Sequence, residues 1–151
     1  MPEPGPPHAN LARLAGTWRG DETLFPSPWS PEERTATGAF TARMGCDGLW
    51  LLSDYEESRD GAVFFRGHGV YGWDAARARY TMYWVDSMGG HPAETLGDWQ
   101  DDVLTFSNQG AHGHGRYVYE LDGADRYVFR ILSSRDGEAW SPMMEGRYRR
   151  V

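Results

Sequence analysis

The sequence contains no lysine and only one cysteine, Cys46. A single cysteine excludes an internal disulfide, and such sparing use of cysteine agrees with a reducing compartment. The 15 basic residues, all arginine, are outnumbered by 22 acidic residues, which gives a formal net charge of −7. Phosphate neutralisation supplies most non-specific affinity for nucleic acid, so an acidic chain without a basic run is not expected to bind DNA or RNA.

Long hydrophobic runs are also missing. No apolar stretch approaches the roughly 20 residues that cross a bilayer, and the N-terminus lacks the basic and then apolar layout of a signal peptide. The sequence therefore predicts a soluble, cytoplasmic protein with no membrane partner. Its 151 residues correspond to one domain, and a domain of this length can bury a core without disulfides or a structural metal.

Helix signals are confined to the beginning of the chain. Residues 1–9 are rich in proline, which disfavours a helix, and we expect a disordered tail there. One short helix fits residues 8–14, with Asn10 as a possible N-cap and Gly16 as its stop. Residues 10–151 are expected to form a single domain.

From Thr17 onward, the apolar residues alternate with polar ones, and turn residues recur at the spacing of successive antiparallel strands. About ten strands are predicted, over residues 17–25, 34–44, 49–58, 63–73, 79–88, 94–99, 103–108, 115–122, 126–133 and 143–150. Asp-Gly pairs between them, such as Asp60-Gly61, supply the positive φ of tight hairpins.

Connections this short cannot carry parallel crossovers, so the strands form an antiparallel meander. Closing such a meander removes its exposed edges. The predicted fold is therefore an all-β, up-and-down barrel with the short helix at one mouth. A flattened two-sheet sandwich and a smaller barrel with edge hairpins are the alternatives.

Several motifs carry a family resemblance. They are Gly16-Thr17-Trp18-Arg19-Gly20, Thr37-Gly38 before Arg43-Met44, Gly69-Val70-Tyr71-Gly72-Trp73-Asp74, Trp84-Val85-Asp86-Ser87-Met88 and Met143-Met144-Glu145-Gly146-Arg147-Tyr148. Together they resemble the bacterial family known as domain of unknown function 1579, through nearly everything after residue 10. The resemblance implies a lipocalin-like, calycin-type β-barrel of about ten strands, and it implies no established activity.

The opening motif is also similar to that of nitrobindin-type barrels. The resemblance implies haem iron held by a histidine late in the chain. The last histidine here is His114, so the sequence does not predict haem, and no other cofactor is expected.

Alternation in the predicted strand 79–88 assigns Tyr80, Met82, Trp84, Asp86 and Met88 to one face, which we take as the inner one. An inward carboxylate needs a cation, hydrogen bonds or a raised pKa. Asp86 is therefore either paired with an arginine or available as a ligand anchor or proton acceptor. The predicted ligand-binding residues are His68, Tyr71, Met82, Trp84, Asp86, His91, His114, Tyr119 and Met144.

Three of those residues are histidines. His68 lies in mid-strand between two glycines that would clear space beside its imidazole, either for a ligand or for a neighbouring aromatic ring. His91 follows two glycines in a connection expected at a barrel mouth. Either could act as a general acid or base. His112 and His114 have a spacing that can chelate a metal, but the surrounding glycines favour a loop, and no metal site is predicted.

Three functions remain open at this point. The first is a binding protein that holds a small hydrophobic or aromatic molecule inside the barrel. The second is a cofactor-independent isomerase or cyclase that uses Asp86 and a histidine in the same place. The third is a packing or oligomerisation domain, with outward aromatics such as Tyr83 forming a homodimer interface. An interior without a cavity larger than a few waters would argue against the first two.

Overall fold

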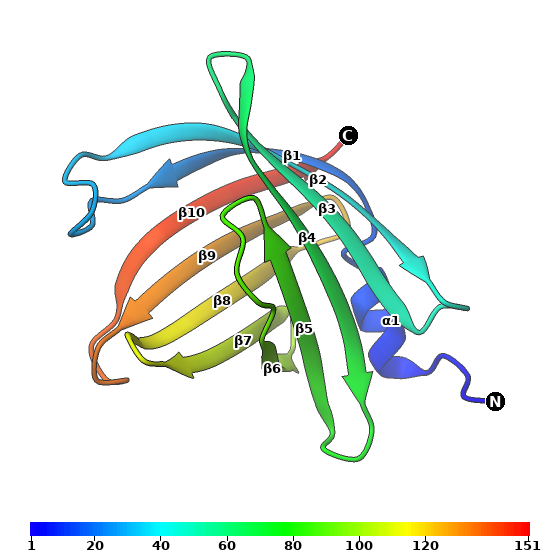
Figure 1. Cartoon of the computed structure of the whole chain (residues 1–151). Coiled ribbons are helices and arrows are strands. Elements are labelled where there is room, and N and C mark those ends of the chain that lie inside the picture. Colours follow the sequence, from blue (N-terminus) through cyan, green and yellow to red (C-terminus); the bar gives the residue numbers. More distant parts are fainter.

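The computed structural model describes all 151 residues and shows a closed barrel of ten antiparallel strands with one helix at its end (Figure 1). The elements are α1 (Pro6–Ala12), β1 (Gly16–Leu24), β2 (Arg34–Gly45), β3 (Trp50–Arg59), β4 (Ala62–Asp74), β5 (Arg79–Asp86), β6 (Glu94–Gln100), β7 (Val103–Gly110), β8 (Gly113–Asp122), β9 (Arg126–Ser134) and β10 (Ser141–Arg150). Each strand pairs with its neighbours in sequence, and β10 pairs with β1. The predicted up-and-down barrel is confirmed.

The strands begin and end within two residues of the predicted bounds. Residues with positive φ make the tight connections, among them Cys46 (51°), Asp47 (59°), Asp60 (52°) and Gly61 (78°). The turn residues and the alternation thus agree on how neighbouring strands pair. A shift of one residue in that pairing would move the apolar side chains of a strand from the inner face to the outer face.

Helix α1 differs from its predicted position. It begins at Pro6, so residues 6–9, which the sequence assigned to a tail, are helical, and the expected domain boundary falls inside the helix. Proline is favoured in a first helical turn because the N–H that it lacks would have no intrahelical partner there. The Gly5 N–H donates to Nδ1 of His8 at 2.9 Å, so His8 caps the helix and Asn10 lies within it.

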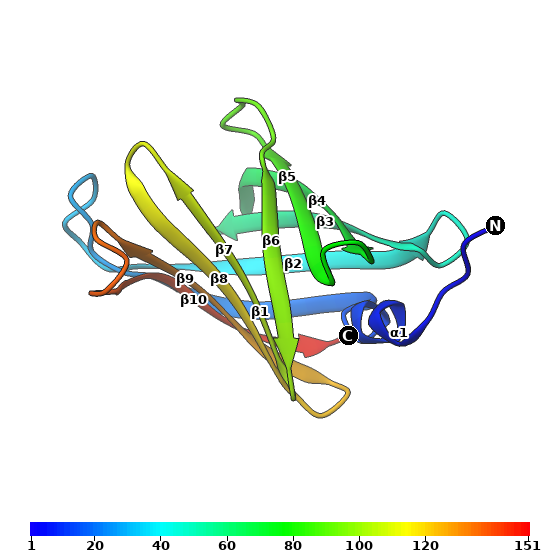
Figure 2. The same ribbon diagram turned by 90° about the horizontal axis from the view of Figure 1, so that it is seen from below.

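The helix closes one end of the barrel. Leu11 is completely buried there, and the indole N–H of Trp18 donates to the Leu14 carbonyl at 3.0 Å. The guanidinium of Arg150 lies 4.1 Å from the Trp18 ring centroid and donates to the Ala15 carbonyl at 2.6 Å. Figure 2 shows the N- and C-termini and α1 at this end. No helix in the molecule has the length and apolar character that a membrane span requires.

Aromatic side chains fill much of the barrel. Phe40 stacks on Tyr55 with ring centroids 4.5 Å apart, and Tyr127 stacks on Tyr148 at 5.0 Å. Aromatic pairs of this kind stabilise by roughly 0.5–1.5 kcal/mol beyond the burial of their area. The many aromatic residues of the sequence therefore form the core of the barrel.

Candidate functional site

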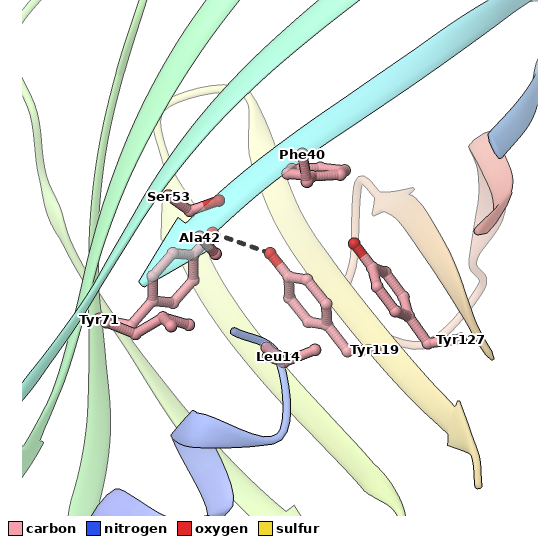
Figure 3. A pocket seen from close by; sticks show the side chains of 8 residues that line it. Leu14, Phe40, Ala42, Ser53, Tyr71, Tyr119 and Tyr127 are labelled. Carbon is pink, nitrogen blue, oxygen red and sulfur yellow. Dashed lines mark hydrogen bonds between the residues drawn. The ribbon is translucent and has the colours of Figure 1, made fainter. Parts of the chain in front are cut away.

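A small cavity with a volume of about 10 Å³ lies inside the barrel next to the helix. It is lined by Leu14, Phe40, Ala42, Leu51, Ser53, Tyr71, Tyr119 and Tyr127 (Figure 3). The hydroxyls of Tyr71 and Tyr119 are hydrogen-bonded at 2.9 Å, and burial raises the pKa of Tyr71 to about 12. A cavity of this size holds about one water. This result argues against a ligand site in the closed interior, which is where both pocket functions were expected from the sequence, and leaves only the open end of the barrel for a ligand.

The end of the barrel opposite α1, here called the far end, is packed less completely. Inward-facing apolar side chains from six strands gather there. This far-end ring consists of Leu24, Phe65, Trp84, Tyr117, Ile131 and Met144, all partly buried except Met144, which is 8% exposed. Strand register places Leu24, Met144, Ile131 and Tyr117 in one row across β1, β10, β9 and β8. A continuous apolar surface thus faces inward at the far end.

The barrel wall is shortest at β6. Pairing between β5 and β6 covers only residues 80–83 of β5, so Trp84 to Asp86 have no backbone neighbour on that side. The exposed connection of residues 87–93 follows them and lies at the far end (Figure 2). The indole of Trp84 is therefore the member of the far-end ring closest to this gap in strand pairing.

Two glutamates are buried in the interior next to this ring. Glu22 is 1% exposed and Glu57 is 7% exposed. The Tyr55 hydroxyl lies 2.8 and 2.9 Å from the two carboxyl oxygens of Glu22 and donates to them, and the Tyr148 hydroxyl donates to Oε1. A Cβ at Gly38 would overlap the Glu22 carboxyl. The bare backbone of Gly38 therefore allows Glu22, from β1, to reach across β2 to Tyr55 and Glu57 on β3.

The carboxyl pair has unusual electrostatics. Burial raises the pKa of Glu22 to about 7, although hydrogen bonds from Tyr148 and Tyr55 oppose this, and the neighbouring Glu57 raises the pKa further. Burial also raises the pKa of Glu57. Neither carboxyl takes part in an ion pair, and Oε1 of Glu57 is buried without a hydrogen-bond partner. The pair can therefore hold a shared proton near neutral pH, in a hydrogen bond between the two carboxyls, and once that proton is lost Oε1 of Glu57 has no other donor.

Most of the predicted binding residues on β4, β5, β8 and β10 do face inward. Met82, Tyr71 and Tyr119 are buried below the far-end ring, and Trp84 and Met144 belong to it. Asp86 accepts hydrogen bonds from the Trp84 indole and the Met88 N–H, both at 2.9 Å. Its partners are thus an indole and a backbone amide, and the expected arginine is not among them.

The predicted histidines lie at the surface of the barrel. His68 is on the outer face, with Nδ1 2.7 Å from Oδ1 of Asp54. His91 is in the exposed β5–β6 connection, at the barrel mouth where it was expected. His114 has its ring 6.4 Å from that of Trp140. Asp86 forms no hydrogen bond with a histidine.

The glycines beside His68 make room for aromatic rings inside the barrel. A Cβ at Gly67 would overlap the Trp84 indole, and one at Gly69 would overlap the ring of Tyr71. The space they clear is inside the barrel and is filled by these two rings. With every imidazole outside, the interior offers no histidine ligand for a haem iron. No group of three or more His, Cys, Asp or Glu side chains is arranged to hold a metal ion.

The carboxyl pair was not predicted from the sequence. The signal was available in β1, where alternation puts Glu22 on the same face as Trp18, and in β3, where it puts Glu57 on the same face as Tyr55. What alternation does not give is the pairing register. Only the register shows that these side chains meet over Gly38.

Comparison with known proteins gives a family and a fold. A family model described as "Protein of unknown function (DUF1579)" matches residues 3–150. Rv2717c from M. tuberculosis is similar in structure with a TM-score of 0.73 and 14% identity, over 97% of this chain and 98% of that one. The S-type phycobiliprotein lyase CPES from Guillardia theta is similar with a TM-score of 0.62 and 9% identity, over 92% of this chain and 88% of that one. No curated protein matches the sequence.

Proposed function

The chain belongs to the DUF1579 family, whose description names no activity, and we propose that it binds a small hydrophobic or aromatic molecule at the far end of its barrel. The observation that carries this proposal is the far-end ring, a set of inward-facing apolar side chains that the fold leaves partly exposed. Ligand sites are typically concave and apolar with a few polar groups.

The location follows from the packing at the two ends. The end next to α1 is sealed by the helix and retains a cavity of only about 10 Å³. A ligand is therefore expected to lie over Trp84, Phe65 and Tyr117, with Met82, Tyr71 and Tyr119 below as a rigid floor. A barrel of about this strand number can enclose one small molecule, and CPES offers an analogy at the level of fold alone.

Native mass spectrometry of protein purified from its own host tests the proposal directly. We expect a bound mass that is removed by organic extraction, and the same spectrum reports whether the chain is a monomer or a homodimer. A spectrum with only the bare polypeptide mass, together with no binding of any apolar probe, would contradict the binding function.

A second experiment tests the location. Trp84→Ala removes the largest side chain of the far-end ring, and loss of roughly 2 kcal/mol of contact should weaken binding of an apolar fluorescent probe by about 30-fold. Trp50→Ala is the matched control, because Trp50 lies on the outer face of β3 against Gly72. Equal effects of the two substitutions on the dissociation constant would place the ligand elsewhere.

The enzymatic alternative named Asp86 and a histidine as its acid and base. The structure shows no hydrogen bond between Asp86 and a histidine. Acid and base work in this barrel would have to use the carboxyl pair of Glu22 and Glu57. We favour binding because the far-end ring supports it without any reacting group.

A further inference from the structure

The buried carboxyl pair lies directly beside the proposed ligand position. Glu57 is the cross-strand neighbour of Phe65, a member of the far-end ring. Tyr55, which donates to Glu22, has its ring centroid 6.0 Å from that of Phe65 and 6.2 Å from that of Trp84. A molecule that contacts Phe65 and Trp84 is therefore next to the carboxyl of Glu57.

The hydrogen bonds of the pair are incomplete in one place. Glu22 accepts from two tyrosine hydroxyls, so its oxygens are satisfied. Glu57 is 7% exposed and shares a carboxyl–carboxyl hydrogen bond with Glu22, but no hydroxyl, amide or guanidinium donates to its buried Oε1. A buried acceptor of this kind costs roughly 1–3 kcal/mol if it stays unpaired. A ligand that brings a hydrogen-bond donor would remove that cost.

The charge of the pair identifies the kind of donor. Two carboxyls share the interior, and no arginine side chain forms an ion pair with either. Buried charges are normally paired, and a neutral hydroxyl would satisfy Oε1 without compensating a negative charge. A cation would do both, and the faces of nearby aromatic rings attract cations as well.

We propose that the far end of the barrel recognises a molecule with a protonated amine on an apolar body, and that Glu22 and Glu57 together receive the ammonium group. This inference rests on the proposed binding function and names its ligand class. The apolar body lies against Phe65 and Trp84, and the ammonium donates to Oε1 of Glu57.

Amine binding should then be linked to proton release. The groups that face the pair are Tyr55 on β3, Tyr148 on β10 and Tyr127 on β9, with Arg59 at the end of β3. Burial raises the pKa of all three tyrosines, so they stay neutral. An incoming ammonium favours the ionised pair and displaces the proton that the pair shares. Amine affinity should therefore increase as the pH rises through neutrality, while the affinity of a neutral molecule should not change.

The test uses four probes of one shape: 1-naphthylmethylamine, 1-naphthylmethanol, 1-methylnaphthalene and 1-naphthoate. Titration calorimetry on the intact protein should show the amine binding about tenfold or more tightly than the hydrocarbon above neutral pH, and the carboxylate binding most weakly. Repeating the amine titration in buffers of different ionisation enthalpy should show proton release.

Two variants assign the effect to the pair. In Glu57→Gln the amine should lose its advantage over the hydrocarbon, and Glu22→Gln should reduce the advantage and abolish proton release. Glu56→Gln is the matched control, because Glu56 is the next residue along β3 and its side chain is 52% exposed on the outer face. It should retain the amine preference. Circular dichroism of each variant shows whether the barrel is folded.

The outcomes separate the two proposals. If the hydrocarbon binds and the amine binds no more tightly, the amine inference is wrong and the binding function stands. If none of the four probes binds, both fail. If the preference disappears in Asp86→Asn but persists in Glu57→Gln, the cation is received by Asp86 and the inference is overturned.

Discussion

Replacing Glu22 by glutamine should change how the stability of the barrel depends on pH. Burial raises the pKa of Glu22 from an ordinary 4.5 to about 7, so the folded protein holds this proton more tightly than the unfolded chain does. Stability is then highest below the unfolded pKa, and it is lost as the pH rises through the folded pKa. Glutamine resembles the protonated carboxyl and does not ionise.

The size of the effect follows from the two pKa values of Glu22. A tenfold change in proton affinity corresponds to about 1.4 kcal/mol, so the ordinary value of 4.5 and the folded value of about 7 imply a loss of about 3 kcal/mol. The pKa of Glu57 is raised by burial and lowered by its hydrogen bond with Glu22, and a glutamine amide at position 22 can donate to Glu57 in place of the carboxyl.

Urea denaturation of both proteins between about pH 4 and about pH 8 measures the difference in the free energy of unfolding. Wild type and Glu22→Gln should be nearly equal at the acid end, and the variant should be more stable by about 3 kcal/mol at the alkaline end. The exposed Glu56→Gln should show no such divergence. A difference between wild type and Glu22→Gln that stays constant across the range would refute the raised pKa.

Other substitutions test the surrounding structure. Gly38→Ala should destabilise the fold by about 1–3 kcal/mol in urea denaturation, because its Cβ would overlap the Glu22 carboxyl; wild-type stability would contradict that close approach. Tyr148→Phe should raise the pKa of Glu22 further, since the Tyr148 hydrogen bond lowers it, and a carboxyl titration followed by NMR would show an unchanged midpoint if the bond is absent. Leu11→Ala should cost about 2–5 kcal/mol, because Leu11 is 0% exposed; a loss well below this range would mean that α1 does not seal the barrel.

The strands were predictable because their signals are local. Alternation and turn residues such as Asp60-Gly61 depend on a few neighbouring positions, and they identified all ten strands. The start of α1 was missed because proline was taken as a helix breaker, although Pro6 occupies a first turn where its missing N–H costs nothing. His8 likewise has a capping role that only its bond to Gly5 reveals.

The candidate site was less predictable because it depends on several strands at once. Asp86 was predicted to be an inward carboxylate, and alternation along its own strand was enough for that prediction. Glu22 and Glu57 meet only through the register of β1, β2 and β3. The glycines beside His68 left open whether a ligand or an aromatic ring fills the space that they clear, and only the structure shows that the Trp84 ring lies against Gly67.

The pairing of β1 with β10 has a consequence for synthesis on the ribosome. One edge of β1 stays unpaired until β10 leaves the exit tunnel. During that time the edge can pair with strands of other chains. Glu22 also lacks the Tyr148 hydroxyl until then. A nascent chain that stops before β10 would therefore expose two unpaired strand edges, β1 and β9.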